Sequence, residues 1–263
     1  MFFCKPYEFE PCGLFGLEHW LMLVVTALLI AGGLYLSRQM TEQQVRRTVR
    51  IVTCGLWGLE VAKIFFVLLV TGSRNPNDFI PLYYCSLILY AGLFSSVGKG
   101  WLQRLGDVFI STGGIVGGLC FLIVPNTSLP RYPAFHFISF HSFLLHGLMV
   151  FLGLLLLIRG VCRLSLKDIF YCAGLISTMC VLALSFNLIW DATHPGAAAN
   201  LMFMSQNFTG TPIALLYKWT GGPPIFSICM WLIQAFVPYL AVFGVYQLVL
   251  HIMAQRACRT QES

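Results

Sequence analysis

The chain has 263 residues, of which 58% are hydrophobic and 10% are charged, and its formal net charge is +6. A soluble domain of this size cannot bury so much apolar surface, so the composition excludes a water-soluble protein and predicts a polytopic membrane protein. The positive charge fits attraction to anionic lipid headgroups, and it does not indicate nucleic acid as a partner.

Apolar runs long enough to cross a bilayer fill the chain, since a membrane helix needs about 20 residues. We expect an all-α fold, a polytopic membrane helix bundle with seven transmembrane helices that forms a single membrane domain over residues 1–263. The expected spans are 17–36, 48–71, 79–97, 107–125, 134–158, 168–190 and 223–252.

The second expected span contains two ionisable residues, Glu60 and Lys63. Charged side chains inside a membrane are costly, and they commonly mark functional sites. They are three positions apart along the helix, so they share a face and can pair. Two interpretations stay open: a structural ion pair that fixes helix packing, or a pair with a role at a site.

The third expected span opens with the sequence Pro-Leu-Tyr-Tyr-Cys, residues 81–85. Proline suits the first turn of a helix, which places Cys85 about one turn inside the membrane. The positive end of the helix dipole favours a thiolate there, whereas burial in lipid opposes it. A nearby histidine that takes the proton would make Cys85 a nucleophile for acyl transfer. The alternative is a small packing residue.

The fifth expected span offers three histidines, His136, His141 and His146. A spacing of five residues rotates each by about 140°, so they do not form one stripe. His146 shares a face with Ser142, in a polar stripe suited to a bundle interior. Measured from the outer ends of their spans, Cys85 lies about 9 Å deep, His141 about 10 Å and His146 about 18 Å. His146 is therefore favoured as a base by its face, and His141 is the alternative favoured by its depth.

A long connection, residues 191–222, joins the sixth and seventh expected spans. Structureless loops of this length are uncommon and are often functional. The connection is also unusually apolar around Leu201 to Met204. We expect it on the outer side, either folded back onto the bundle as a re-entrant or interfacial segment or lying as an ordinary capping loop. Within it, Asn200 is a candidate oxyanion donor, and a backbone amide is the alternative donor.

Lysine and arginine are distributed unequally between the two sides of the expected spans. One side carries 11 of them and the other carries four, with Lys63 left out of the count because it lies inside a span. The positive-inside rule therefore predicts an outside N-terminus and an inside C-terminus. The inner set is Arg38, Arg46, Arg47, Arg50, Lys99, Arg104, Arg159, Arg163, Lys167, Arg256 and Arg259, and the outer set is Lys5, Arg74, Arg131 and Lys218.

Four short segments, taken in order, resemble the motifs of a known family. Residues 81–85 are similar to its Pro-Leu-His-Leu-Cys element, and residues 144–147, Leu-Leu-His-Gly, are similar to its histidine helix. Residues 200–204 are similar to its Asn-Tyr-Met element, and residues 221–224, Gly-Gly-Pro-Pro, to its Gly-Pro-Trp-Pro element. With these motifs and the seven-span plan, the chain resembles the YwaF-type integral membrane proteins of bacteria. More distantly, it resembles the eukaryotic transmembrane protein 164 acyltransferases.

The resemblance implies a membrane-embedded acyltransferase or acyl hydrolase that acts on lipid acyl chains. It assigns Cys85 as the nucleophile and His146 as the base, and this mechanism needs no metal or nucleotide cofactor. The expected partners are membrane lipids, either lysophospholipid or phospholipid, and the expected location is an integral, multi-pass one, in the plasma membrane if the source is bacterial. The candidate substrate-binding residues are Asn200, Glu60, Ser142 and His141.

One alternative belongs to a different class of function. The chain would then be a non-catalytic lipid-binding or small-solute transport protein. Glu60 and Lys63 would be its functional pair, and Cys85 would be a packing residue. The sequence leaves the oligomeric state open.

Overall fold

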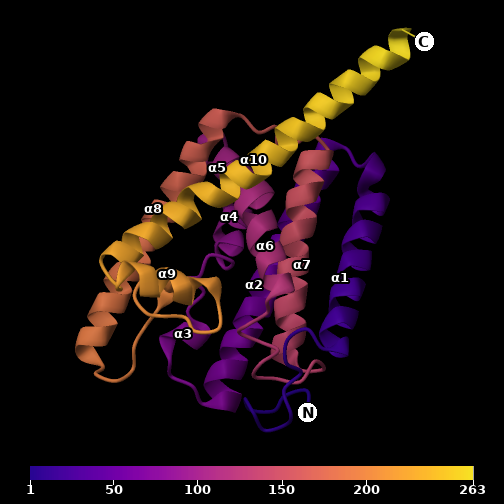
Figure 1. Ribbon diagram of the computed structural model, residues 1–263. Helices are drawn as coiled ribbons and strands as arrows, with labels where there is room; N and C mark the ends of the chain where they lie inside the picture. The colour runs from indigo at the N-terminus through magenta and orange to yellow at the C-terminus, as the bar shows by residue number, and fades with distance from the viewer. Residues whose placement is uncertain (263) are drawn as a thin grey trace.

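The computed structural model describes residues 1–262, and every regular element within that range is helical (Figure 1). The all-α prediction is therefore confirmed. The α-helices are α1 (Leu17–Leu36), α2 (Glu42–Phe66), α3 (Pro76–Phe79), α4 (Leu87–Val97), α5 (Trp101–Phe109), α6 (Ile115–Ile123), α7 (Phe137–Ile158), α8 (Ile169–Thr193), α9 (Pro212–Thr220) and α10 (Ile225–Glu262). Short 3-10 helices are η1 (Ser37–Gln39), η4 (Leu166–Asp168) and η5 (Leu201–Phe203), and π-helical turns are η2 (Val67–Thr71) and η3 (Ile110–Gly114).

Six helical stretches in the described chain are long and apolar enough to cross a membrane. The protein is thus an integral, multi-pass membrane protein. The six are Leu17–Gln39, Glu42–Thr71, Trp101–Ile123, Phe137–Ile158, Leu166–Thr193 and Ile225–Ala257.

The third expected span, 79–97, is not one continuous helix. Only its second part, the 11-residue α4, is helical. At 1.5 Å per residue this helix is about 16 Å long, so it does not cross a hydrocarbon core of about 30 Å by itself. Ile80 has extended backbone angles, as the residue before a proline commonly does. The helix is therefore interrupted before Pro81, and the expectation that Pro81 lies in the first turn of the spanning helix is wrong.

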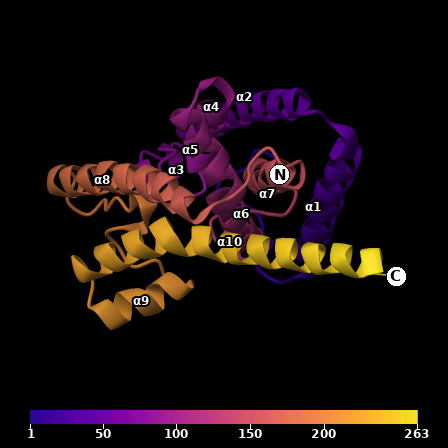
Figure 2. The same ribbon diagram turned by 90° about the horizontal axis from the view of Figure 1, so that it is seen from above.

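Helix α7 packs against α1, α2, α6 and η3, and α10 crosses α8 and η3 (Figure 2). Glycines allow the closest of these approaches. A Cβ added at Gly118 would lie 2.8 Å from the carbonyl oxygen of His146, and one added at Gly153 would lie 2.6 Å from that of Ile110. Small residues at such points let membrane helices pack backbone to backbone. The α5–η3–α6 helix and α7 therefore form a tight pair inside the bundle.

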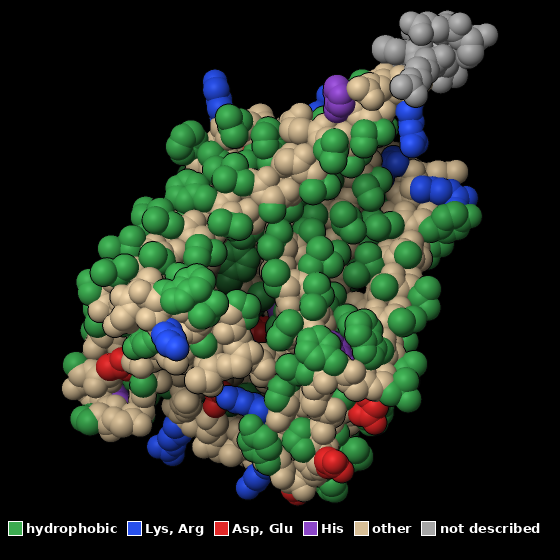
Figure 3. Space-filling view, viewed as in Figure 1, with side chains coloured by type: hydrophobic (Ala, Val, Ile, Leu, Met, Phe, Trp, Pro, Cys, Tyr) green, Lys and Arg blue, Asp and Glu red, His purple; other side chains and the backbone are tan. Residues whose placement is uncertain are grey.

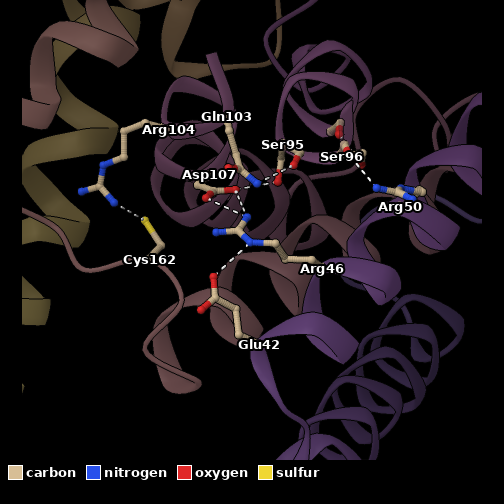
Figure 4. Close-up of polar contacts among 10 residues, drawn as sticks. Glu42, Arg46, Arg50, Ser95, Ser96, Gln103, Arg104, Asp107 and Cys162 are labelled. Carbon is tan, nitrogen blue, oxygen red and sulfur yellow. Dashed lines mark hydrogen bonds and ion pairs between the residues drawn. The ribbon is translucent and has the colours of Figure 1, made fainter. Parts of the chain in front are cut away.

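One end of the bundle carries a network of charged side chains (Figure 4). Arg46 of α2 lies 3.1 Å from the carboxylate of Asp107 in α5, which also accepts a 2.6 Å hydrogen bond from Ser95 of α4. Arg104 of α5 binds both carboxylate oxygens of Asp168, at 3.0 and 2.5 Å. This charged end joins the starts of α2, α5 and α8 and the end of α4, and it gathers residues that the sequence placed on one side.

The opposite end holds the segment before α1 and the loop before α7. The backbone N–H of Tyr7 donates to the carbonyl of Arg131 at 3.1 Å, and that of Phe137 donates to Phe2 at 2.9 Å. Arg131 also lies 3.7 Å from Asp78, which belongs to α3. The N-terminal segment, α3 and the start of α7 therefore share this end, which lies across the bundle from the charged end in Figure 1.

Candidate functional site

Cys85 lies two residues before α4, in the non-helical stretch 80–86. Its Sγ atom is 3.7 Å from the carbonyl oxygen of Gly117 in α6 and donates a hydrogen bond to it. The neighbouring Tyr84 ring lies along the same helix. A Cβ at Gly113 would come within 2.6 Å of the Tyr84 hydroxyl oxygen, and one at Gly117 within 3.1 Å of its ring. Two glycines, Gly113 in η3 and Gly117 in α6, thus let the cysteine segment pack directly on the backbone of this continuous helix.

His146 is a buried histidine with one free nitrogen. Its Nδ1 lies 2.6 Å from the carbonyl oxygen of Ser142, which can only accept, so Nδ1 carries the proton and Nε2 holds the lone pair. Nε2 is buried and has no hydrogen-bond partner in the described part of the chain. The ring stacks on Phe121 of α6 with 3.6 Å between ring centroids. A neutral imidazole with a free lone pair is in the state that a general base requires.

Cys85 and His146 pack against the same turn of α6. Gly117 touches the thiol and Phe121 stacks on the imidazole, and these two residues are four apart on the helix. No hydrogen bond joins Cys85 to His146 among the residues described. The difference in depth between Cys85 and His146 that the sequence predicts assumes that residues 79–85 are helical. A non-helical stretch advances by up to about 3.3 Å per residue, against 1.5 Å for a helix, and so reaches deeper.

A buried ionic cluster joins α2 to α7. Glu60 is 1% exposed, and its Oε1 lies 2.5 Å from Nζ of Lys63, so the pairing expected from their spacing is present. Its Oε2 lies 3.3 Å from Nε2 of His141, which is close enough for an ion pair but makes no hydrogen bond. We call these three residues the Glu60 cluster. Removing one partner of such a cluster leaves a buried charge uncompensated, which is strongly destabilising.

The Glu60 cluster and Cys85 lie at the same level of the bundle. Helices α2 and α4 are antiparallel, and Trp57 Nε1 donates to the carbonyl of Leu89 at 3.1 Å. The next turn of α2 carries Glu60, and it therefore faces the residues just before α4. Figure 3 shows the surface hollowed between α9 and α7, below α10, with an acidic side chain at the bottom of the hollow.

The predicted site residue Asn200 holds its own loop together. Its Nδ2 donates to the carbonyl of Gln206 at 3.1 Å, and its Oδ1 accepts from the backbone N–H groups of Ser205 and Gln206 at 3.0 and 2.9 Å. Its backbone N–H donates to Asn77 Oδ1 at 2.7 Å. The side-chain amide is therefore committed to the loop, and the structure does not bring it to Cys85.

The connection before α9 folds back onto the cysteine segment through residues that the sequence reasoning missed. The N–H of Met202 donates to the carbonyl of Leu82 at 3.1 Å. Asn187 of α8 bonds both backbone groups of Leu201, and Gln234 of α10 donates to the carbonyl of Met202 at 3.0 Å. Non-helical backbone at membrane depth needs such partners. An amide side chain inside an apolar run was the signal that identifies Asn187 and Gln234.

His136 is a capping residue just outside the membrane-spanning part of α7. Its Nδ1 accepts from the N–H of Ile138 at 3.0 Å, and its Nε2 lies 3.1 Å from the carbonyl oxygen of Cys4. Both contacts need the neutral ring, which is fully buried, and burial lowers the pKa of His136 below its usual value. This histidine therefore ties the N-terminal segment to α7.

Comparison with known proteins gives one match. The model of the TMEM164 family matches residues 14–252 and so covers Cys85, His146 and the Glu60 cluster. No curated protein and no solved structure matches the chain. The match confirms the more distant resemblance, to the transmembrane protein 164 proteins, and it is compatible with the resemblance to YwaF-type proteins.

Proposed function

Because the chain belongs to the TMEM164 family, we propose that it is a membrane-embedded acyltransferase or acyl hydrolase of lipid acyl chains. Cys85 is the nucleophile and His146 is the general base. The observation that carries the proposal is the free, buried Nε2 of His146, which lies on the same turn of α6 as the thiol of Cys85. Thiol activation needs a base with an unoccupied lone pair within reach of the cysteine, and both residues contact α6 within one helical turn.

The reaction proceeds in two balanced steps. His146 Nε2 takes the proton of the thiol, and the thiolate attacks the carbonyl carbon of a lipid ester. The ester C–O bond breaks, the leaving lysolipid oxygen takes the proton from His146, and a thioester remains on Cys85. A lysophospholipid hydroxyl, or water, then attacks the thioester while His146 accepts its proton. The C–S bond breaks, and the leaving sulfur of Cys85 takes that proton from His146, which restores the thiol and the neutral imidazole. Catalytic hydrogen bonds are often long before substrate binds, so we expect the lipid to draw the two side chains together.

The start of α4 contributes the remaining electrostatic element. Cys85 lies just before this 11-residue helix, whose N-terminal end carries partial positive charge. That charge stabilises a thiolate and the oxyanion formed on the attacked carbonyl. We therefore assign the oxyanion to backbone N–H groups of the turn just before α4. The N–H groups of Leu87, Ile88 and Leu89 already donate to the carbonyls of that turn, and the amide of Asn200 is occupied within its loop.

The chain crosses the membrane seven times, and its third crossing is broken. Helix α2 begins at the charged end and α5 begins there too, so the chain returns across the bundle between Thr71 and Trp101. The stretch 80–86 and α4 together make this return. The 11-to-4 distribution of lysine and arginine places the N-terminus outside and the C-terminus inside. Residues 191–222 then form an outer connection that re-enters the bundle, and the membrane is the plasma membrane if the source is bacterial.

Acyl transfer in proteoliposomes tests the proposal. The purified chain is reconstituted with a phospholipid that carries a labelled acyl chain and with a lysophospholipid acceptor. We expect label on the protein as a hydroxylamine-sensitive thioester and then on the acceptor. Cys85→Ala removes both signals, and His146→Gln lowers the rate by the 10²–10⁴-fold typical of a lost general base.

Cys120→Ala is the matched control, because Cys120 lies on α6 at the turn that Cys85 contacts. It should keep both signals. Full transfer by Cys85→Ala would refute the nucleophile. The absence of a thioester and of transfer in the wild-type chain would favour the lipid-binding or transport alternative, in which Cys85 is a packing residue.

A further inference from the structure

The Glu60 cluster has no part in the acyl-transfer steps, although it is built of buried ionisable groups. Glu60 is 1% exposed, and His141 is 4% exposed with an Nε2 atom that forms no hydrogen bond. Burying charges at this depth of a membrane protein is costly, and such groups commonly line a site. An unbonded, buried imidazole nitrogen beside a carboxylate and an ammonium group leaves the cluster with unused capacity for a polar ligand.

The position of the cluster relates it to the acyl site. His141 precedes His146 by five residues on α7, so it lies about 7.5 Å nearer to the start of that helix. Lys63 follows Glu60 toward the end of α2, which is the same end of the bundle. The cluster therefore lies at the level of Cys85, and it is closer than His146 to the end of the bundle that holds α3 and the N-terminal segment. In a glycerophospholipid, the polar headgroup lies on that side of the ester when the acyl chain points toward the bilayer centre.

We propose that Glu60, Lys63 and His141 form a headgroup subsite for a zwitterionic phospholipid while its ester lies at Cys85; this inference rests on the proposed acyl chemistry. Lys63 and His141 supply donors for the headgroup phosphate, and the carboxylate of Glu60 faces the headgroup cation. Phosphate and ammonium groups are the complements of these side chains. The three residues then determine which lipid presents its ester to the thiol.

Net charge is the basis of the selectivity. A Glu60 carboxylate and a Lys63 ammonium sum to zero. A headgroup with one phosphate and one cation keeps the filled subsite neutral. An anionic headgroup, such as glycerol phosphate, leaves one uncompensated negative charge in a low-dielectric interior, where electrostatic mismatch discriminates strongly between ligands.

A competition assay with the full chain tests this charge rule. Two lysophospholipid acceptors share one acyl chain and differ in headgroup, phosphocholine against glycerol phosphate, and the ratio of their acylation is measured in proteoliposomes. Glu60→Gln makes the cluster cationic and should move the ratio toward the glycerol phosphate acceptor by about tenfold. Lys63→Met makes it anionic and should move the ratio the other way.

The double variant Glu60→Gln/Lys63→Met is neutral again, and its ratio should return toward that of the wild type. Glu42→Gln, an exposed carboxylate on the same helix, is the matched control and should leave the ratio unchanged. Binding of the two lysolipids to Cys85→Ala measures the same preference without any chemistry, so it separates the subsite from the acyl reaction.

The outcomes separate the two proposals. If the wild type transfers acyl chains and none of the cluster variants changes the ratio, the headgroup subsite is refuted while the acyl proposal stands. If the variants lower both rates equally, the cluster is only a structural ion pair and the inference is also refuted. If the wild type transfers nothing, yet Cys85→Ala prefers the phosphocholine lipid and the charge variants reverse that preference, the acyl proposal fails and the subsite stands as a binding site.

Discussion

Replacing Gly117 by alanine should disturb the acyl site through a single added carbon atom. The new Cβ would lie 3.1 Å from two atoms of the Tyr84 ring and 3.4 Å from Cε of Met149. The Tyr84 ring also contacts Phe109 of α5, with 5.7 Å between ring centroids, so relief requires the segment that carries Cys85 to shift by a few tenths of an ångström.

The magnitude follows from two opposing effects. Overpacking a close interior contact costs about 1–3 kcal/mol. Replacing glycine in a helix interior by alanine returns about 1 kcal/mol. The net loss of unfolding free energy should therefore be about 1 kcal/mol. Misplacement of a reacting group by 1 Å can cost about 10²-fold, so a smaller shift of Cys85 should lower the transfer rate by about tenfold.

Thermal unfolding in detergent and initial rates in proteoliposomes measure these two effects. Gly174→Ala in α8 is the matched control, because an added Cβ there meets no atom within 4 Å. That control should gain about 0.5–1 kcal/mol and keep full activity. If Gly117→Ala is as stable and as active as Gly174→Ala, then the packing of the cysteine segment on α6 does not require a glycine at residue 117.

Three further results are expected. Glu60→Leu should lower the free energy of unfolding by about 3–5 kcal/mol, because it leaves Lys63 as a lone buried charge. The double variant Glu60→Leu/Lys63→Leu should lose clearly less unfolding free energy. Equal losses for the two variants in unfolding experiments would contradict the ion pair as the source of the effect. Stability should fall as the pH drops below about 6.5, because the folded state holds His136 neutral with a lowered pKa while the unfolded chain takes up the proton. His136→Asn keeps a cap but does not titrate, so it should weaken this pH dependence. An unchanged pH profile in the variant would contradict the role of His136. Arg104→Ala should lower the melting temperature more than Arg50→Ala. Arg104 binds a buried carboxylate with two hydrogen bonds, whereas Arg50 binds one exposed carbonyl. A larger loss for Arg50→Ala would contradict the role given to Arg104 at the charged end of the bundle.

Hydropathy predicts most of the helices because each long apolar run must become a helix in lipid. Six of the seven expected spans correspond to helices of spanning length. The third run was apolar throughout, and the period of its side chains carried no sign of a break. The break at Ile80 depends on the proline after it and on backbone partners from residues more than 100 positions away, such as Met202. Hydropathy does not contain such contacts.

The candidate site was predictable in its parts rather than in its arrangement. The pairing of Glu60 with Lys63 follows from a spacing of three on a helix. The approach of His141 to Glu60 depends on the rotation of two separate helices, which one sequence does not supply. The turn of α6 that meets both Cys85 and His146 consists of glycine and ordinary apolar residues, so no polar pattern identifies it.

The π-helical turn η3 has a mechanical consequence for this protein. It lies within one continuous helix, between the arginine contacts of α5 at the charged end and the Gly117–Phe121 turn of α6 at the acyl site. A π-turn contains one more residue than the α-helical turn it replaces, and one residue corresponds to a rotation of about 100°. If η3 adopted α-helical geometry with the same number of residues, the extra residue would thus turn α6 by about 100° relative to α5. The glycine face would leave Cys85 and the Phe121 ring would leave His146, while the arginines kept their partners. The rotation of α6 relative to α5 is therefore set by the five residues of η3, which have no described contact with the Cys85 thiol or the His146 imidazole.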